Sequence, residues 1–212
     1  MVSYNAISTI LFGGIVDNIG KEFKFLRESL SKTNIQIPFR SYLSAAMMSA
    51  LVIYLFSLVA ITGFLMFFDL LIVQKILMIL FGPILLALAT FSVLVLYPYQ
   101  KMLSTAKSID VNLPFALSHM AAIAESGVPP YMIFKLLSKF DEYGEIAREM
   151  QVLVRNMDTF GIDPLTAIRN LADRTPSNEF RQVMLGIVSA TEGGGDVKSY
   201  IKNAGEQALF EW

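Results

Sequence analysis

Few residues in this chain could do nucleophilic or metal chemistry. Its 212 residues include no cysteine and one histidine, which excludes a disulfide framework, a thiolate zinc site and a cysteine nucleophile. His119 lies on a predicted helix among Leu117, Met120 and Ala121, and the local sequence offers no nucleophile or acid to complete a catalytic group. We interpret it as a packed or edge histidine. We predict a protein that is not an enzyme, with no catalytic residue, metal site or cofactor.

A run of three glycines is the one segment that could cradle an anion. Gly193, Gly194 and Gly195 precede a predicted helix, whose first backbone N–H groups could bind a phosphate. A nucleotide loop also needs a strand before the glycines and a Lys-Ser or Lys-Thr pair after them, and neither is present. We therefore interpret the run as an interhelical turn and expect no ATPase machinery in this chain.

Charged residues beside the turns are the candidates for partner binding. Glu125 and Glu192 each precede a turn glycine, and together with Asp163 and Asp196 they could gather on one side of a helical domain. Clustered carboxylates suit a hard cation or the arginines of a partner. Acidic residues at helix starts can instead simply favour the helix dipole. A basic helix face is the other candidate surface, so the predicted partner-binding residues are Glu125, Asp163, Glu192, Asp196, Arg148 and Arg155.

Three glycine-led turns recur along the C-terminal half at a fixed spacing. Gly127, Gly161 and Gly195 are equally spaced in the sequence, and each turn is followed by a proline or aspartate that can start a helix. We predict a positive φ, or close packing against a helix, at Gly127, Gly161 and at least one of Gly193 to Gly195. The spacing fits a helical repeat array, or simply the length of two helices plus turns. The tetratricopeptide signature is absent, which favours the second explanation.

The apolar pattern of the same region predicts helices alone. Apolar residues recur on one face of each segment, and no strand-like alternation occurs. One-sided stripes of this kind bury against each other in a bundle. We predict an all-α fold with an antiparallel six-helix bundle, its helices near residues 112–125, 129–140, 142–160, 164–174, 177–192 and 196–212.

Two long uncharged segments precede the bundle. Hydrophobic residues make up 54% of the chain and charged residues 17%, compared with about 25% charged in a typical soluble domain. No charge occurs from Ser41 to Phe68 or from Ile76 to Tyr99, and about 20 apolar residues cross a bilayer core. We predict a transmembrane hairpin at 41–99, with spans at about 41–68 and 76–99.

Basic residues predict the orientation of this hairpin. The loop between the spans carries only Lys75, so the positive-inside rule places residues 69–75 outside and both ends of the chain in the cytoplasm. We expect a multi-pass protein of the cytoplasmic membrane. The predicted domains are a cytoplasmic amphipathic segment at 1–40, the hairpin at 41–99 and a cytoplasmic helical domain at 100–212. The flanking basic residues are Lys21, Lys24, Arg27, Lys32 and Arg40 on one side and Lys101 and Lys107 on the other.

The N-terminal segment contains a short apolar run from Ile7 to Val16, broken by Gly13 and Gly14. It lacks the basic region and cleavage site of a signal peptide. It could be a membrane-surface helix or a docked or frayed terminus. At the other end, the last predicted helix reaches Trp212 without a glycine or proline terminator, so we expect the chain to be part of a longer protein.

With these turns and spans in place, the chain resembles the type II secretion system F-domain family over roughly residues 20 to 212. Members are membrane platform proteins of type II secretion systems, type IV pili, tight-adherence pili and the archaellum. The short segment before the first predicted span favours the archaeal or tight-adherence branches. The motifs that carry the resemblance are Glu125-Ser126-Gly127, Gly161-Ile162-Asp163-Pro164-Leu165-Thr166-Ala167, Glu192-Gly193-Gly194-Gly195-Asp196, and the archaeal-like lead-in Ile35-Gln36-Ile37-Pro38-Phe39-Arg40-Ser41-Tyr42-Leu43-Ser44.

The resemblance implies a platform that couples a hexameric secretion ATPase to the insertion or extraction of pilin-like subunits, embedded in a lipid bilayer and assembled as a homo-oligomer. The net charge of −1 gives no electrostatic case for nucleic acid. An alternative is a membrane-anchored signalling or adaptor protein with a helical cytoplasmic partner-binding domain, although residues 69–75 are too short to sense a ligand. A third class is an intramembrane enzyme, which would need a charged partner for the hydroxyl residues of the spans, Ser44, Ser49, Ser57, Thr62 and Ser92.

Overall fold

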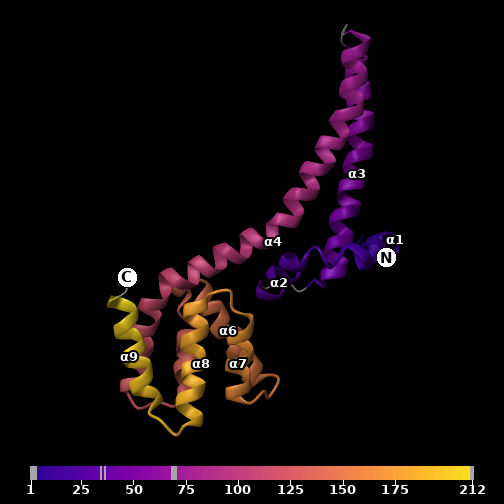
Figure 1. Ribbon diagram of the computed structural model, residues 1–212. Coiled ribbons are helices and arrows are strands. Elements are labelled where there is room, and N and C mark those ends of the chain that lie inside the picture. The colour runs from indigo at the N-terminus through magenta and orange to yellow at the C-terminus, as the bar shows by residue number, and fades with distance from the viewer. Residues whose placement is uncertain (1–3, 34, 36, 68–70, 211–212) are drawn as a thin grey trace. The chain divides into compact units, whose positions relative to one another are not determined.

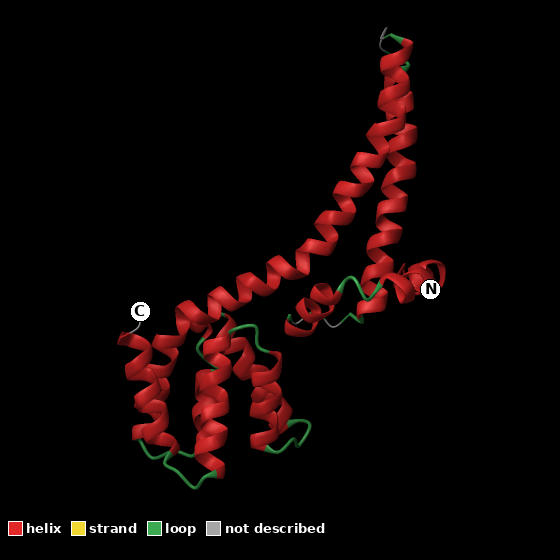
Figure 2. Cartoon of the chain, in the orientation of Figure 1, coloured by secondary structure: helices red, strands yellow, loops and turns green. Residues whose placement is uncertain are grey.

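Nearly all of the described chain is helical. The computed structural model describes residues 4–33, 35, 37–67 and 71–210. Within these ranges the regular structure is α-helix with one short 3₁₀ helix and no strand (Figure 2). The predicted all-α fold class is therefore confirmed for the described residues. The chain divides into two compact units, Met1–Lys101 and Met102–Trp212.

Two helices have the length and composition of membrane spans. Helix α3 (Phe39–Leu65) contains 27 residues and helix α4 (Ile72–Glu125) contains 54, whereas about 20 apolar residues suffice to cross the hydrocarbon core. Large apolar side chains of both helices are exposed, with Phe56 at 74% and Leu85 at 64%. This distribution suits helices whose solvent is lipid. The predicted end of the first span, Phe68, lies outside the described residues.

Helix α4 continues far beyond its apolar part. The sequence predicts one helix over 76–99 and a separate one over 112–125, but the helix is unbroken from Ile72 to Glu125, so the prediction of two elements was wrong. No glycine or proline occurs between Gln100 and Leu113 to end the helix, and lysine, methionine, leucine and alanine there favour its continuation. The change from an apolar to an amphipathic pattern therefore marks a change of surroundings within one helix.

Two short helices, α1 (Tyr4–Ile19) and α2 (Lys24–Lys32), pack near the start of α3. The apolar run at Ile7–Val16 thus lies on a helix that packs against α3, which leaves the alternative of a membrane-surface helix open. The hydroxyl of Tyr42 on α3 donates a hydrogen bond to the carbonyl of Leu94 on α4 at 2.8 Å. The buried residues of this small core are Val16, Leu26, Leu30, Leu43 and Val95.

The second unit contains the C-terminal part of α4 and five further described α-helices, and consecutive helices among these five pack against each other (Figure 1). Asp163 caps α7 by accepting a hydrogen bond from the backbone N–H of Thr166, and Ser177 caps α8 in the same way through Phe180. The sequence prediction of a helix over 164–174 coincides with α7. The helices are α5 (Pro130–Leu137), α6 (Glu145–Asp158), α7 (Pro164–Arg174), α8 (Asn178–Glu192) and α9 (Val197–Phe210).

The connection between α5 and α6 is longer than predicted. The sequence places helices at 129–140 and 142–160, but α5 ends at Leu137, the 3₁₀ helix η1 (Asp141–Tyr143) follows, and α6 begins after Gly144. Gly144 has a φ of +55°, a backbone conformation that side chains disfavour. This glycine stops the helical pattern although the apolar periodicity continues across it.

The pattern of buried residues in the second unit repeats once in each helical hairpin. Helices α4, α6 and α8 bury residues at the same positions counted back from their last residue, and helices α5, α7 and α9 each bury their fifth residue. Three helical hairpins therefore share one register. This supports the repeat explanation over the one that the sequence alone favoured. The repeated core residues are Leu113, Leu117 and Met120; Ile146, Met150 and Leu153; Phe180, Met184 and Ile187; and Phe134, Ile168 and Ile201.

Leu153 tests this core. Its side chain is 1% exposed, so Leu153→Asp would bury a carboxylate without a partner. We expect it to lower the free energy of unfolding of residues 102–212 by about 3 to 5 kcal/mol. Arg155→Asp, on the exposed side of the same helix, is the control and should change it by less than about 1 kcal/mol. Urea titration followed by circular dichroism measures both, and equal effects would contradict the assigned core.

Candidate partner-binding surface

The three glycine turns lie at one end of the second unit, which we call the turn end. They comprise residues 126–129, 159–163 and 193–196, and join α4 to α5, α6 to α7 and α8 to α9 (Figure 2). Gly127, Gly161 and Gly194 have φ values of +78°, +62° and +67°. The predicted positive φ is therefore present in every turn. In the third turn it falls on Gly194, while Gly193 has a φ of −75°.

An acidic residue ends each helix that runs toward the turn end. Glu125, Asp158 and Glu192 are the last residues of α4, α6 and α8. A carboxylate at a helix C-terminus is unfavourable beside the helix dipole, so it gains from a cationic partner on a neighbouring helix.

Each of these carboxylates has such a partner. Lys135, Arg169 and Lys202 are the sixth residues of α5, α7 and α9. Asp158 pairs with Lys135 at 3.2 Å, Glu192 pairs with Arg169, and Glu125 lies 3.6 Å from Lys202. The Glu125–Lys202 pair joins the first and last helices of the unit, so each helix from α4 to α9 contributes one member of an ion pair. We call these three pairs the acid–base ring.

Tyr131 strengthens one member of the acid–base ring. Its hydroxyl donates a 2.5 Å hydrogen bond to Asp158. This bond, followed by that from Lys135, lowers the pKa of the Asp158 carboxyl. The same hydroxyl and the Asp158 carboxylate raise the pKa of Lys135, the tyrosine again contributing most. Asp158 is a residue that the sequence reasoning missed, although it lies almost midway between Glu125 and Glu192 in the sequence.

The predicted acidic residues share the turn end but do not form a metal site. Asp163 caps α7, and Asp196 accepts hydrogen bonds from the backbone N–H of Lys198 at 3.0 Å and from the hydroxyl of Ser199 at 2.6 Å. The Ser199 bond is the main cause of the lowered pKa of Asp196. Within the described residues no three acidic or histidine side chains meet in the geometry of a metal ion site.

The predicted basic residues are not members of the acid–base ring. Arg148 and Arg155 are both exposed on α6, two turns from each other. Arg148 pairs with Glu145 on its own helix at 2.6 Å. His119 lies elsewhere, with its Nδ1 2.9 Å from the Tyr143 hydroxyl and its ring 4.6 Å from that of Phe140. It packs against both rings, as the sequence interpretation expected.

A second polar network lies at the end of the unit opposite the turn end. Glu149 on α6 is 6% exposed and accepts a 2.5 Å hydrogen bond from Arg174 at the end of α7. Burial raises the pKa of the Glu149 carboxyl, and Arg174 only partly opposes this. Ser177 donates a 2.5 Å hydrogen bond to Asp110 on α4. Sequence reasoning missed both pairs because the members of each are far apart along the chain.

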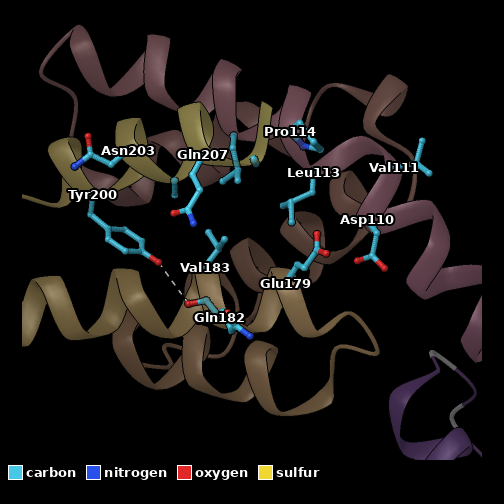
Figure 3. Close-up of a pocket in the computed structure, with 13 residues that line it drawn as sticks. Asp110, Val111, Leu113, Pro114, Glu179, Gln182, Val183, Tyr200, Asn203 and Gln207 are labelled. Atoms are coloured by element: carbon cyan, nitrogen blue, oxygen red, sulfur yellow. Dashed lines mark hydrogen bonds between the residues drawn. The ribbon is translucent and has the colours of Figure 1, made fainter. Parts of the chain in front are cut away.

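A groove of about 400 Å³ opens between α4, α8 and α9. Figure 3 shows Asp110 and Glu179 toward one end of it and Tyr200 and Asn203 toward the other. The Tyr200 hydroxyl donates to the Gln182 carbonyl at 3.5 Å. Polar rims around an apolar floor suit contacts with another protein. The floor residues are Val111, Leu113, Pro114, Leu117, Val183, Ala204 and Ala208.

Together, two helices of membrane-spanning composition and a unit built of helical hairpins indicate a membrane protein with a separate helical domain. Residues 116–211 match the family model described as type II secretion system protein F. This part of the chain is therefore a domain of the type II secretion system F-domain family, and the resemblance seen in the sequence is confirmed over these residues.

Two curated proteins of Methanocaldococcus jannaschii are similar to this chain. One, described as uncharacterized, is 34% identical over 115 residues, which cover 54% of this chain and 19% of that protein. The other, flagella accessory protein J, is 28% identical over 106 residues, covering 50% of this chain and 19% of that protein. The match thus spans about a fifth of the length of each relative. No solved structure matches.

Gly161 tests the turn geometry. A Cβ atom there would meet no atom within 4 Å, so a substitution would cost backbone strain alone. Gly161→Ala should lower the free energy of unfolding by about 1 kcal/mol and Gly161→Val by about 1 to 2 kcal/mol. Gly161→Asn is the control and should cost less, because asparagine tolerates a positive φ. Denaturant titration measures the order, and an equal loss for all three would contradict strain as the cause.

The buried Glu149 predicts a pH effect. Its pKa lies above the ordinary value of 4.5 in the folded protein. Its contribution to stability is therefore full below the unfolded-state pKa and is lost as the pH rises through the folded-state pKa. Glu149→Gln lacks this loss, so its stability relative to the unmodified protein should rise as the pH increases above the ordinary carboxyl pKa of 4.5.

Unfolding titrations at several pH values measure this difference. Arg174→Met is the matched variant: it leaves the carboxylate without its counter-charge, so its stability should fall more steeply with pH. Parallel pH profiles for all three proteins would contradict the raised pKa.

Proposed function

We propose that this chain is part of a membrane platform protein of a filament-assembly or secretion machine, acting without catalysis of its own. The observation that carries the proposal is that an F domain follows two helices of membrane-spanning composition. Helix α4 continues from the second of these into the F domain without a break. A helix that begins among lipids and ends in a protein core can pass a displacement between the two surroundings.

The proposed topology follows the basic flanks of the two spans. Residues 1–40 and 100–212 lie in the cytoplasm, residues 69–75 lie outside, and the hairpin spans residues 41–99 of the cytoplasmic membrane. In this arrangement the second unit is a cytoplasmic antiparallel six-helix bundle. Its similarity to flagella accessory protein J supports an archaeal machine, with the archaellum as the leading candidate.

The proposed partners are a hexameric secretion ATPase on the cytoplasmic side, pilin-like subunits in the membrane, and further copies of the same protein. We assign the ATPase contact to the turn end. Its loops present equivalent backbone turns, and Glu125, Asp163, Glu192 and Asp196 lie beside them. The exposed Arg148 and Arg155 of α6 form the alternative contact surface.

Reversing the charge of Glu192 distinguishes an effect on partner binding from an effect on domain stability. Glu192 and Arg169 are both about half exposed, so Glu192→Lys should leave the domain folded. We expect it to weaken co-purification with the ATPase of the same organism, and filament assembly, by about tenfold or more, equivalent to about 1.4 kcal/mol.

The double variant Glu192→Lys, Arg169→Glu is the matched control, because it restores the ion pair with the charges reversed. If Glu192 acts on the partner, the double variant stays defective. Recovery in the double variant would show that the pair serves the fold alone, and normal assembly by Glu192→Lys would contradict the proposed contact.

A further inference from the structure

Helix α1 presents an apolar surface that the rest of its unit leaves uncovered. Ile10 is 80% exposed and Leu11 62%, and Ile7 and Ile15 are exposed beside them. From Tyr4 to Val16 the sequence contains no acidic or basic residue. A soluble surface rarely concentrates large apolar side chains in this way unless something apolar covers them.

Two contacts fix where α1 lies along α3. The Tyr4 hydroxyl lies 2.9 Å from the Ser49 hydroxyl, and Asp17 forms a 2.9 Å ion pair with Arg40. Helix α1 therefore lies beside the N-terminal end of α3, with Tyr4 near Ser49 and Asp17 near Arg40 (Figure 1). The segment of α3 from Arg40 to Ser49 corresponds to about 14 Å along the helix axis.

This position coincides with the boundary region of a bilayer. Helix α3 contains 27 residues and is about 40 Å long, whereas the hydrocarbon core is about 30 Å thick. An α3 that crosses the core without tilt therefore places about 10 Å of its length among the headgroups. The Asp17–Arg40 pair is about half exposed at this end, which suits the polar side of that boundary, and Tyr4 and Ser49 lie toward its apolar side.

Basic side chains accompany α1 at the same end of α3. Helix α2 buries Leu26 and Leu30 against the small core that Val16 and Leu43 share, and its other face carries both cations and the exposed Glu28. Lys21, Lys24 and Arg27 are exposed. An apolar helix surface with neighbouring cations is complementary to an anionic lipid surface, with acyl chains below and phosphates above.

We propose that α1 is a third membrane-inserted element, lying in the headgroup–acyl boundary of an anionic bilayer. Ile10 and Leu11 enter the acyl region, and Lys21, Lys24 and Arg27 contact lipid phosphates. The proposal rests on the proposed insertion of α3 in the membrane. In this position lipid covers the apolar surface of α1. That surface is then continuous with the lipid-facing surface of α3, against which α1 packs.

Single spin labels measure the depth of α1. The natural sequence has no cysteine, so Ile10→Cys and Leu11→Cys can each carry one nitroxide in the intact chain, reconstituted into phosphatidylcholine–phosphatidylglycerol vesicles. Relative access of molecular oxygen and a water-soluble nickel chelate reports depth. We expect both labels at about 5 to 10 Å below the phosphates. Ser31→Cys, exposed on α2, should read as aqueous, and Val59→Cys, exposed on α3, should lie deeper than either α1 label.

The outcomes distinguish this inference from the proposed function. Aqueous labels at Ile10 and Leu11 with a deep label at Val59 would overturn the membrane role of α1 alone. An aqueous label at Val59 would overturn the proposed membrane protein as well. Labels on α1 that are immobile and shielded from both reagents would show that protein covers this surface, and would also overturn the proposal.

The proposed contact of the basic residues with lipid phosphates has a separate test. Lys24→Gln with Arg27→Gln should reduce the depth of the Ile10 label in anionic vesicles to that seen in pure phosphatidylcholine. Ser31→Gln is the control for substitution on α2 and should leave the depth unchanged. An equal depth in anionic and neutral vesicles for the unmodified chain would overturn the assignment of these cations to lipid phosphates.

Discussion

The C-terminal unit depends on the burial of one stripe of side chains, repeated three times. Each helix that runs toward the turn end contributes three fully buried residues at the same distances from its last residue. Burial of one such side chain contributes about 1.5 to 3 kcal/mol. The chain can repeat this arrangement only if every hairpin reverses at the same position. The three turn glycines with positive φ allow that reversal without steric strain, and the shared register follows from it.

Sequence patterns predicted the elements that depend on local chemistry. The bounds of α7 follow from Asp163, which caps it, and from Pro164 at its first position. The turns at Gly127 and Gly161 follow from the preference of glycine for positive φ. The patterns failed at α4 and at Gly144. Helix α4 continues because no breaking residue interrupts it, whereas Gly144 interrupts a segment whose apolar periodicity continues.

The candidate site was less accessible to sequence reasoning. Glu125 and Glu192 were recognised because they adjoin glycines, but their partners Lys202 and Arg169 were not. Those partners lie on other helices, and only the packing of the helices brings them close. The nearly even spacing of Lys135, Arg169 and Lys202 along the chain was a usable signal, since a repeated hairpin must place equivalent side chains at equivalent distances from its turn.

The acid–base ring limits how the turn end can recognise a partner. Because its carboxylates already have cationic neighbours, a partner gains little by offering one isolated cation to a single carboxylate, and exposed pairs of this kind contribute little to stability. Recognition of the proposed partner at the turn end would therefore depend on the shape of the turns and on rearranged ion pairs. The groove between α4, α8 and α9 differs, since Asp110 and Glu179 lie at one end of an apolar floor without a basic residue in its lining. A partner that inserts an apolar side chain beside a cation would satisfy both parts of that groove. Contacts at the two sites would then have different salt dependence, because screening weakens the exposed pairs more than it weakens apolar burial.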